Sequence, residues 1–209
     1  MPGPIEFLPL AELRRQLEIN VIGQVAVTQV FLPLIRAARG RIVNMGSISG
    51  RMATPFTGAY GASKHALEAL TDALRLELAP WGISVSIVEP GAVATPIWEK
   101  AARTAAEMLG GVPPEALVLY GDAIEAVKNR AKRAEKGAVD PGAVARIVEH
   151  ALSSPKPRTR YVVGREAKIQ AALALLAPDR VRDSLVAKSM GLPKAAPSAP
   201  PKAGEGAWG

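Results

Sequence analysis

Three residues that can move a proton together lie between positions 47 and 64. Tyr60 and Lys64 are four residues apart, a spacing that places two side chains on one face of a helix, one turn from each other. A free tyrosine has a pKa of about 10, but a nearby cation favours the phenolate and lowers that pKa. Ser47 follows a short apolar run, where its hydroxyl can hydrogen-bond a substrate oxygen. The spacing therefore predicts an acid/base site.

Each of these residues also has an ordinary structural explanation. A Tyr four residues before a Lys is more often a packed ring beside a solvated ammonium than a catalytic pair. A serine after a strand is commonly a helix cap or a turn residue. The order of the whole stretch is more specific, because an apolar run, Arg41–Met45, and the glycine-flanked segment Gly46–Gly50 both precede the Tyr–Lys pair.

In this order and spacing the chain resembles the short-chain dehydrogenase/reductase family. The resemblance rests on the segments Asn44–Gly50, Tyr60–Lys64 and Pro90–Thr95, and it extends from about Pro4 to about Gly164. It implies an α/β fold with a Rossmann-like, doubly wound parallel sheet. It also implies that the chain is an oxidoreductase that interconverts an alcohol and a ketone with NAD or NADP as the cofactor.

The resemblance assigns roles to individual residues. Tyr60 would exchange a proton with the substrate oxygen, Ser47 would orient that oxygen, and Lys64 would lower the pKa of Tyr60. Asn20 matches a family residue that holds a relay water beside the lysine, although an Asn inside a helix can equally bond a neighbouring carbonyl. A Pro-Gly pair after a strand is otherwise an ordinary turn. The cofactor-binding residues implied by the resemblance are Tyr60, Lys64, Pro90, Gly91, Val93 and Thr95.

Apolar periodicity predicts the elements that position these residues. We expect a helix over Leu10–Ala38, which Pro33 would kink or break near its end, and another over Ala59–Ala79. Asp140 and Pro141 mark the start of a further helix. The predicted buried parallel strands are Arg41–Met45, Ile83–Val88 and Thr159–Val163. Since ligands of such sheets bind at the carboxyl ends of the strands, Ser47 and the Pro-Gly turn are expected on one rim.

The domain organisation follows from these elements. We expect an incomplete Rossmann-like domain over residues 1–192, with a substrate lid at about 96–136 and two C-terminal helices at about 168–190. Those helices could cap the cleft, pack in an oligomer or touch a membrane surface. Residues 193–209 are low in complexity and are expected to be a disordered tail. The candidate lining residues of the lid are Met108, Leu109, Leu117 and Tyr120.

The glycine-rich turn that seats the cofactor pyrophosphate in this family is not found between a strand and a helix ahead of Ser47. No Gly-x-x-x-Gly-x-Gly pattern occurs, and Met1 falls just after the expected place of the family's Asn-Asn-Ala-Gly segment. We therefore expect a sheet truncated on its N-terminal side, with an open edge on the Arg41–Met45 strand. Little or no activity is expected from this polypeptide alone.

Composition excludes several classes of site. The 209 residues, 48% of them hydrophobic, suffice for one domain with a core. The absence of cysteine excludes disulfides and thiolate chemistry, and with only two histidines no metal site is expected. The net charge of +7 is spread over the chain without a nucleic-acid motif, so no nucleic-acid partner is expected. The longest apolar stretch, taken as Ala171–Ala177, is too short to span a bilayer, and no signal peptide is visible, so we expect a cytoplasmic protein.

Partners are expected from the resemblance as well. The apolar lid and C-terminal helices favour a lipophilic alcohol or ketone as the substrate, with little membrane contact. The helices Leu10–Ala38 and Ala59–Ala79 resemble those of the family's dimer interface, so a homo-oligomer is expected. The alternative function is a non-enzymatic fragment that dimerises with a full-length relative.

Overall fold

Three parallel strands form the centre of the protein. The computed structural model describes residues 3–100, 103–104, 113–193 and 195. The strands are β1 (Arg41–Met45), β2 (Ser84–Pro90) and β3 (Arg160–Val163), and they lie side by side in that order. Their register pairs Met45 with Val88 and Pro90 with Val163, so that the carboxyl ends of all three strands lie at one edge. The predicted α/β fold with parallel strands is confirmed.

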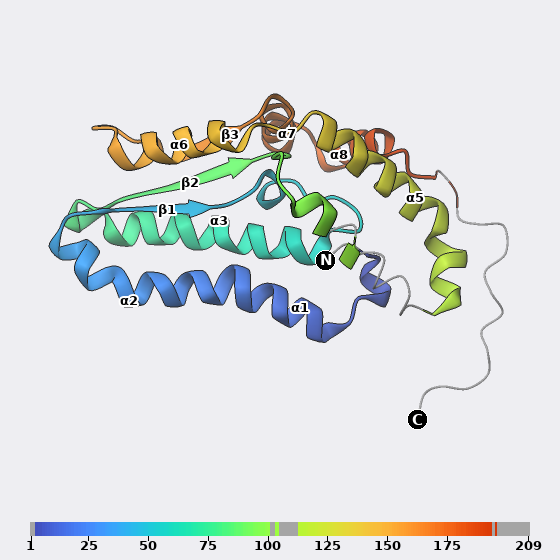
Figure 1. Cartoon of the computed structure of the whole chain (residues 1–209), viewed down its shortest axis with the longest axis horizontal. Helices are drawn as coiled ribbons and strands as arrows, with labels where there is room; N and C mark the ends of the chain where they lie inside the picture. Colours follow the sequence, from blue (N-terminus) through green and yellow to red (C-terminus); the bar gives the residue numbers. More distant parts are fainter. Residues whose placement is uncertain (1–2, 101–102, 105–112, 194, 196–209) are drawn as a thin grey trace.

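Helices cover both faces of this sheet (Figure 1). On one face lie α1 (Leu10–Leu17), α2 (Gly23–Ala37) and α3 (Gly58–Leu78), and on the other lies α6 (Pro141–Ser153). Beyond the carboxyl ends of the strands lie α5 (Pro114–Lys136), α7 (Arg165–Leu176) and α8 (Asp179–Met190). Short 3₁₀ turns occur at Ile5–Phe7, Ile48–Gly50 and Ala79–Trp81, and residues 97–100 and 103–104 are helical. Asp140 caps α6 as predicted, its carboxylate accepting a hydrogen bond from Ala143 N–H over 3.1 Å.

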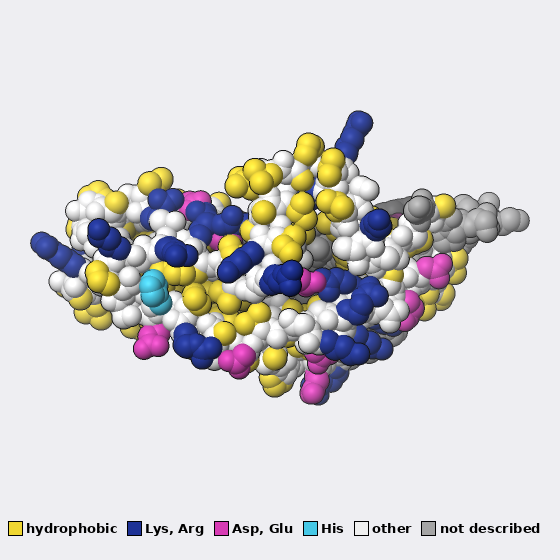
Figure 2. All heavy atoms as spheres, turned by 90° about the horizontal axis from the view of Figure 1, so that it is seen from above, with side chains coloured by type: hydrophobic (Ala, Val, Ile, Leu, Met, Phe, Trp, Pro, Cys, Tyr) yellow, Lys and Arg dark blue, Asp and Glu magenta, His cyan; other side chains and the backbone are white. Residues whose placement is uncertain are grey.

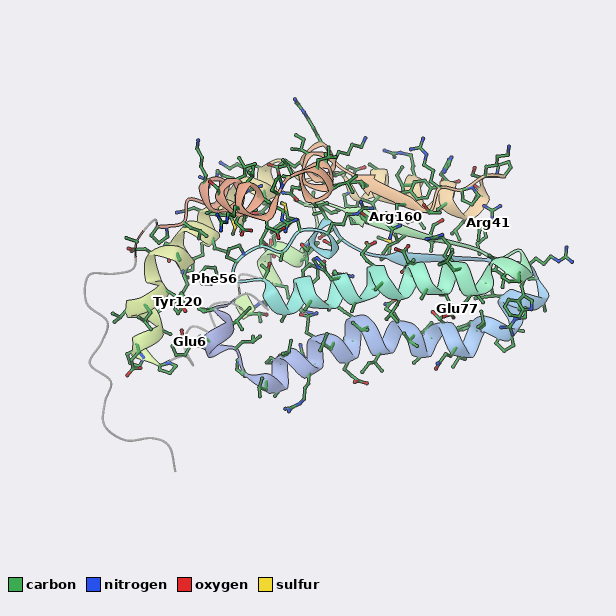
Figure 3. All side chains as sticks on the ribbon, turned by 180° about the vertical axis from the view of Figure 1, so that it is seen from behind. Glu6, Arg41, Phe56, Glu77, Tyr120 and Arg160 are labelled. Atoms are coloured by element: carbon green, nitrogen blue, oxygen red, sulfur yellow. The ribbon has the colours of Figure 1, made fainter. Side chains whose placement is uncertain are left out.

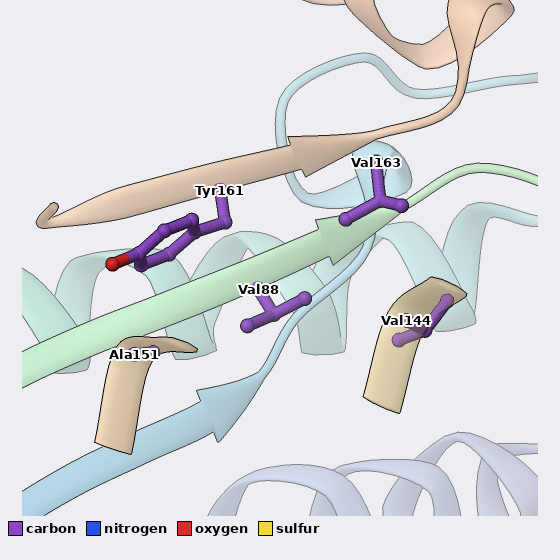
Figure 4. Close-up of a cluster of buried hydrophobic side chains, with 5 residues drawn as sticks. All are labelled: Val88, Val144, Ala151, Tyr161 and Val163. Carbon is purple, nitrogen blue, oxygen red and sulfur yellow. The ribbon is translucent and has the colours of Figure 1, made fainter. Parts of the chain in front are cut away.

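The core consists of two apolar clusters, one on each face of the sheet. Successive strand residues point to opposite faces, so Val88 faces α6 while Val85 faces the layer of α2 and α3. Figure 4 shows the first cluster, in which β2 and β3 meet α6. Its buried members are Val88, Val144, Ala151, Tyr161 and Val163. These contacts hold the strands in the register that aligns their carboxyl ends.

The first long helix differs from its prediction. Instead of one helix over Leu10–Ala38, a π-helical turn at Glu18–Ile22 separates α1 from α2. The N–H of Gly23 donates to the carbonyl of Glu18, five residues back, which inserts one extra residue into the turn. Pro33 lies inside α2 and does not end it, because the helix continues to Ala37. The interruption thus lies near Asn20 and not at the proline.

The same helical region also contradicts the expectation that no apolar stretch of the chain is long enough to span a bilayer. The longest one is not Ala171–Ala177, because Leu10–Ala37 is long and apolar enough to cross a membrane by length and composition, with a mean hydropathy of 1.4 in its best window. The reason is that no charged residue occurs between Glu18 and Arg36. None of that window is buried within this chain. Length and composition alone do not separate a membrane helix from one that packs against another protein surface.

Two predicted segments fall in part outside the described residues. Of the lid at 96–136, residues 101–102 and 105–112 are not described, and these include the candidate lining residues Met108 and Leu109. Its described part is mainly α5. The tail at 193–209 is described only at two positions, 193 and 195.

The surface carries both signs of charge. On the face seen in Figure 2, Lys and Arg side chains are spread among acidic and apolar ones and do not gather into a single basic patch. Several of the basic groups on the protein are paired, as in the contacts Arg182–Asp179 and Arg130–Glu166.

Candidate active site

The backbone around Ser47 holds this residue at the carboxyl end of β1. Gly46 extends the strand pairing, because its N–H donates to the Val88 carbonyl over 2.8 Å. Ser47 is buried, and its Oγ accepts a hydrogen bond from Ser49 N–H over 3.1 Å, which caps the following 3₁₀ turn. That bond uses only an acceptor position of the hydroxyl. The Ser47 hydroxyl hydrogen can therefore be donated to Tyr60 or to a substrate oxygen.

Tyr60 and Lys64 lie one turn apart near the start of α3, as their spacing predicted. The Lys64 Nζ lies 5.8 Å from the centre of the Tyr60 ring and donates to the carbonyl oxygen of Met45 over 2.8 Å. The Ser47 turn rests against the backbone of α3, since a Cβ on Gly50 would lie 2.9 Å from the Lys64 carbonyl oxygen. The structure thus brings Ser47, Tyr60 and Lys64 together.

The expected lowering of the Tyr60 pKa by Lys64 is corrected by this geometry. Burial raises the pKa of Tyr60 above its ordinary value, and the Ser47 hydroxyl offsets only part of that rise. The Lys64 ammonium is directed at the Met45 carbonyl, so it does not counter the burial of the phenol. Burial also lowers the pKa of Lys64, and Glu68 opposes this effect. In this arrangement Tyr60 is a neutral phenol near pH 7, the form that donates a proton.

Asn20 reaches the site from the π turn between α1 and α2. Its Nδ2 donates to Oγ of Ser63 over 3.1 Å, and that hydroxyl donates to the Tyr60 carbonyl over 2.7 Å. Ser63 is fully buried and directly precedes Lys64. Asn20 therefore contacts the Tyr–Lys helix through Ser63, a partner that sequence reasoning missed. Its part in a proton relay remains a prediction.

The Pro90–Gly91 turn lies on the same rim as Ser47, because β1 and β2 are adjacent and parallel. Gly91 N–H donates to the Val163 carbonyl over 3.0 Å, which continues the pairing of β2 with β3. A Cβ on Gly91 would lie 3.1 Å from the Cβ of Ala167, so this glycine lets the loop approach α7 closely. Because Gly91 has no side chain, the backbone of the turn stays close to the carboxyl ends of the strands.

Val93 and Thr95 complete the predicted cofactor-binding loop. Val93 pairs with Val139 in an isolated parallel bridge, and its carbonyl accepts a hydrogen bond from the Trp98 indole N–H over 2.7 Å. A backbone contact from Val93 to a ligand would therefore use its N–H group. Thr95 is half-buried two residues further along.

The residues present fit one end of a nicotinamide cofactor. Ser47 and Gly91 follow the neighbouring parallel strands β1 and β2, at the edge where α/β sheets bind their ligands, and Tyr60 on α3 lies beside Ser47. Lys64 carries an ammonium group that can donate to ribose hydroxyls. No glycine-rich turn of the kind that seats a pyrophosphate precedes these residues in the sequence. The described residues therefore offer partners to the nicotinamide end and not to the pyrophosphate.

Tyr120, a candidate lining residue of the lid, ties α5 to the N-terminal segment. Its hydroxyl donates to Oε2 of Glu6 over 2.7 Å, and this carboxylate raises the pKa of Tyr120. Its ring meets those of Phe7 and Phe56 edge-on, with centroids 6.1 and 6.0 Å away. Figure 3 shows Glu6, Phe56 and Tyr120 at the same end of the molecule. The Tyr120 side chain is thus engaged by protein groups.

A group of charged side chains next to the Tyr–Lys pair was not predicted from the sequence. The members of this group, the charge network, are Arg51, Glu68, Asp72, Glu89 and Arg160. Two signals in the sequence could have revealed it, since Glu68 is four residues after Lys64 and Glu89 directly precedes the Pro-Gly turn. In the described part of the chain, no group of three or more His, Cys, Asp or Glu side chains is arranged to hold a metal ion.

Comparisons with known proteins show the family of the chain. A family described as short chain dehydrogenase matches residues 1–106. Retinol dehydrogenase 5 of Mus musculus is 39% identical over 189 residues, which cover 88% of this chain and 59% of that protein. NADPH-dependent 3-dehydrocapnine reductase of Ornithobacterium rhinotracheale is 36% identical over 193 residues, or 90% of this chain and 66% of that protein.

Solved structures show the same partial correspondence. A crystal structure of a short-chain dehydrogenase from Streptomyces avermitilis matches with a TM-score of 0.65 and 28% sequence identity. The match covers 88% of this chain and 62% of that one. The chain therefore spans about three fifths of the length of these proteins.

Proposed function

Because this chain belongs to the short-chain dehydrogenase/reductase family, we propose that it carries the catalytic half of an NAD(P)-dependent oxidoreductase that interconverts an alcohol and an aldehyde or ketone. The observation that supports the proposal most directly is the meeting of Ser47, Tyr60 and Lys64 at the carboxyl end of β1. Asn20 adjoins them through Ser63.

Each residue has a role that follows from its contacts. Tyr60, a neutral phenol in this structure, donates its proton to the carbonyl oxygen during reduction and takes it back during oxidation. Ser47 donates its hydroxyl hydrogen to the same oxygen, because the bond that its Oγ accepts from Ser49 N–H leaves this hydrogen free. Lys64 binds the ribose hydroxyls through its ammonium group, and Asn20 holds the relay water. A bound nicotinamide supplies or accepts the hydride.

The substrate class is proposed from relatives and from surface character. One relative is named for retinol, a lipophilic alcohol. The described part of the chain beyond the strand ends is rich in exposed apolar side chains, which suit such a substrate. These are Leu117, Val118, Ile169, Leu175, Leu176, Val181 and Leu185. Retinol is therefore the first substrate to test.

Titration of the purified chain with NADH and NADPH, followed by nicotinamide fluorescence, tests the cofactor part of the proposal. We expect saturable but weak binding, with a dissociation constant of roughly 1 mM, because only the nicotinamide end finds partners. Lys64→Ala should weaken binding at least about fivefold through loss of a charged donor. Lys128→Ala, which removes an exposed lysine on α5, is the control and should bind as the wild type does. Absence of saturation up to about 10 mM for either cofactor would contradict the proposal.

A second candidate function rests on the outward face of α2. Four large apolar side chains are more than half exposed there in one chain, namely Val27 (60%), Val30 (73%), Phe31 (53%) and Leu34 (68%). Such a contiguous apolar face is typical of a surface that another protein covers. We propose that it packs against a second copy, or against a longer relative, so that the chain acts as a dimerisation partner.

Sedimentation equilibrium tests this second candidate. The wild-type chain should show twice the 21.9 kDa mass of one chain, because α2 would be covered by its copy. Val30→Glu should give the single-chain mass, since a carboxylate would have to be desolvated in the interface. Val118→Glu, at an exposed valine of α5, is the matched control and should remain a dimer. A wild-type chain that is monomeric at 100 μM would remove the homodimer.

A further inference from the structure

The charge network joins four elements of the active site. Arg51, just after the 3₁₀ turn of Ser47, donates from Nη2 to Oε1 of Glu89 over 2.8 Å, and its Nε lies 2.5 Å from Oε2 of the same carboxylate. Glu89 is fully buried and precedes the Pro90–Gly91 turn. The Ser47 turn and the cofactor loop are thus connected by an ion pair that includes one charge-assisted hydrogen bond.

Arg160 connects the same carboxylate to α3. From the start of β3 its guanidinium lies 3.3 Å from Oε2 of Glu68, 2.5 Å from Oδ2 of Asp72 and 3.5 Å from Oε1 of Glu89. Arg160 lies above α3 in Figure 3. Asp72 is also paired with Arg75, whose Nη2 lies 3.1 Å from its Oδ1. Lys64 lies one helical turn before Glu68, on the same face of α3.

Glu68 is packed directly beneath the Ser47 turn. A Cβ on Gly46 would lie 3.2 Å from Glu68 Oε1, and a Cβ on Gly50 would lie 3.0 Å from its Cγ. Glu68 is 8% exposed, and its Oε1 has no hydrogen-bond partner within the described residues. The two glycines that flank the Ser47 turn thus make room for the Glu68 carboxylate. Within the described residues, Arg160 is the hydrogen-bond partner of this carboxylate, through Oε2.

We propose that Glu68 is a positioning residue of the active site, which keeps Lys64 in its charged form. This inference rests on the proposed function for its catalytic meaning, because a charged Lys64 is what would bind the ribose hydroxyls. Glu68 acts through Lys64 and not on the substrate, since it lies one turn further along α3 and beneath the Ser47 backbone. The Arg51–Glu89–Arg160 contacts hold it there.

The electrostatics of the two groups support this arrangement. Burial lowers the pKa of Lys64, and the charge of Glu68 opposes that fall. Burial, followed by the charge of Glu89, raises the pKa of Glu68 to about 7, against the effects of Arg160 and Arg51. Glu68 therefore gains its charge near neutrality. Within the described residues, the charged groups that face it are Lys64 and Asp72 on α3, Arg51 after the Ser47 turn, Glu89 on β2 and Arg160 on β3.

Competitive acetylation of the folded chain, with the extent at Lys64 read by mass spectrometry, tests the proposal. The neutral amine is the reacting form, so Glu68→Gln should make Lys64 react roughly three to ten times faster at pH 8 than the wild type. Glu77→Gln removes an exposed carboxylate of the same helix and should leave the rate within about twofold. Equal Lys64 rates in the wild type and Glu68→Gln would overturn the proposal.

This readout separates the two hypotheses, because acetylation needs neither cofactor nor turnover. A chain that fails to bind NADH or NADPH but shows faster Lys64 labelling in Glu68→Gln would contradict the proposed function and support the Glu68–Lys64 coupling. The reverse pattern would support the function and overturn the coupling. If Glu68→Gln does not fold, Arg160→Gln provides the same test. Removing that cation keeps Glu68 protonated to higher pH, so Lys64 should again react faster, and an unchanged rate would count against the proposal.

Urea unfolding as a function of pH tests whether Glu68 is protonated in the folded chain. Because its folded pKa of about 7 lies above the ordinary value of 4.5, the folded chain keeps a proton that the unfolded chain has lost between these values. The resulting stability is fully present below about pH 4.5 and is lost as pH rises through about 7. The urea midpoint should therefore fall more steeply from pH 5 to pH 8 in the wild type than in Glu68→Gln. Parallel curves would overturn this part of the inference.

Discussion

Replacing Tyr60 with Phe should lower the rate of retinol oxidation by about a thousandfold under single-turnover conditions, with the chain in excess of substrate and NAD or NADP at saturating concentration. The substitution keeps the ring and removes only the hydroxyl that exchanges the proton. The Tyr60 side chain is largely buried, so water has limited access to the site and cannot readily take over the proton transfer. The rate is measured by the absorbance of the reduced nicotinamide.

The control for Tyr60→Phe removes the phenolic hydroxyl of a tyrosine outside the proposed active site. Tyr161, on β3, is buried in the core and its hydroxyl accepts a hydrogen bond from Arg158 N–H over 2.8 Å. Tyr161→Phe should lower the free energy of unfolding by about 1 kcal/mol while leaving the rate within about twofold. A Tyr60→Phe chain that keeps more than a tenth of the wild-type rate would show that another group handles the proton.

Replacing Gly50 with Ala should lower the free energy of unfolding by about 1–3 kcal/mol. A Cβ at this position would lie 2.9 Å from the carbonyl oxygen and 3.1 Å from the carbonyl carbon of Lys64, both of which are backbone atoms. A backbone contact of this length cannot be relieved by a rotamer change, so the Ser47 turn and α3 must move apart. We therefore expect the same variant to lose activity, because the distance between Ser47 and Tyr60 would increase.

Gly121→Ala is the matched control for this substitution. Gly121 lies within α5, and a Cβ there would meet no atom within 4 Å. Alanine in an open helical position should raise the free energy of unfolding by roughly 0.5–1 kcal/mol, because glycine loses more backbone entropy on folding. Urea unfolding of both variants at one pH gives the comparison. A Gly50→Ala chain as stable as the wild type would mean that the Ser47 turn does not rest on α3 as closely as the structure shows.

Local sequence patterns determined the order and type of the elements. The apolar, β-branched run at Arg41–Met45 became β1 with the predicted bounds, and the Tyr60–Lys64 spacing became one helical turn. Asp140 and Pro141 start α6 as predicted, because capping depends on residues that are close in sequence. The end of β2 was placed two residues early. Glu89 and Pro90 belong to it only because they pair with Val162 and Val163, which are distant in the chain.

The π turn around Asn20 could not be read from periodicity. Its neighbours follow an ordinary helical pattern, and Pro33 was the more visible candidate for an interruption. The Asn20 side chain reaches Ser63, a residue 43 positions away and buried near the start of α3. Such a partner becomes visible only when the two helices are packed.

By itself, the sequence determined the family, the parallel α/β core and the identity of the groups that can exchange a proton, since each depends on residue types at short, fixed spacings. Only the tertiary structure decided where those groups point. It directs Lys64 to the Met45 carbonyl, raises the pKa of Tyr60 by burial, and places Glu68 between the Ser47 turn and Arg160, which is 92 positions away in the chain. The physical reason is that burial and electrostatic pairing depend on distances in space, and residues far apart in the sequence set those distances.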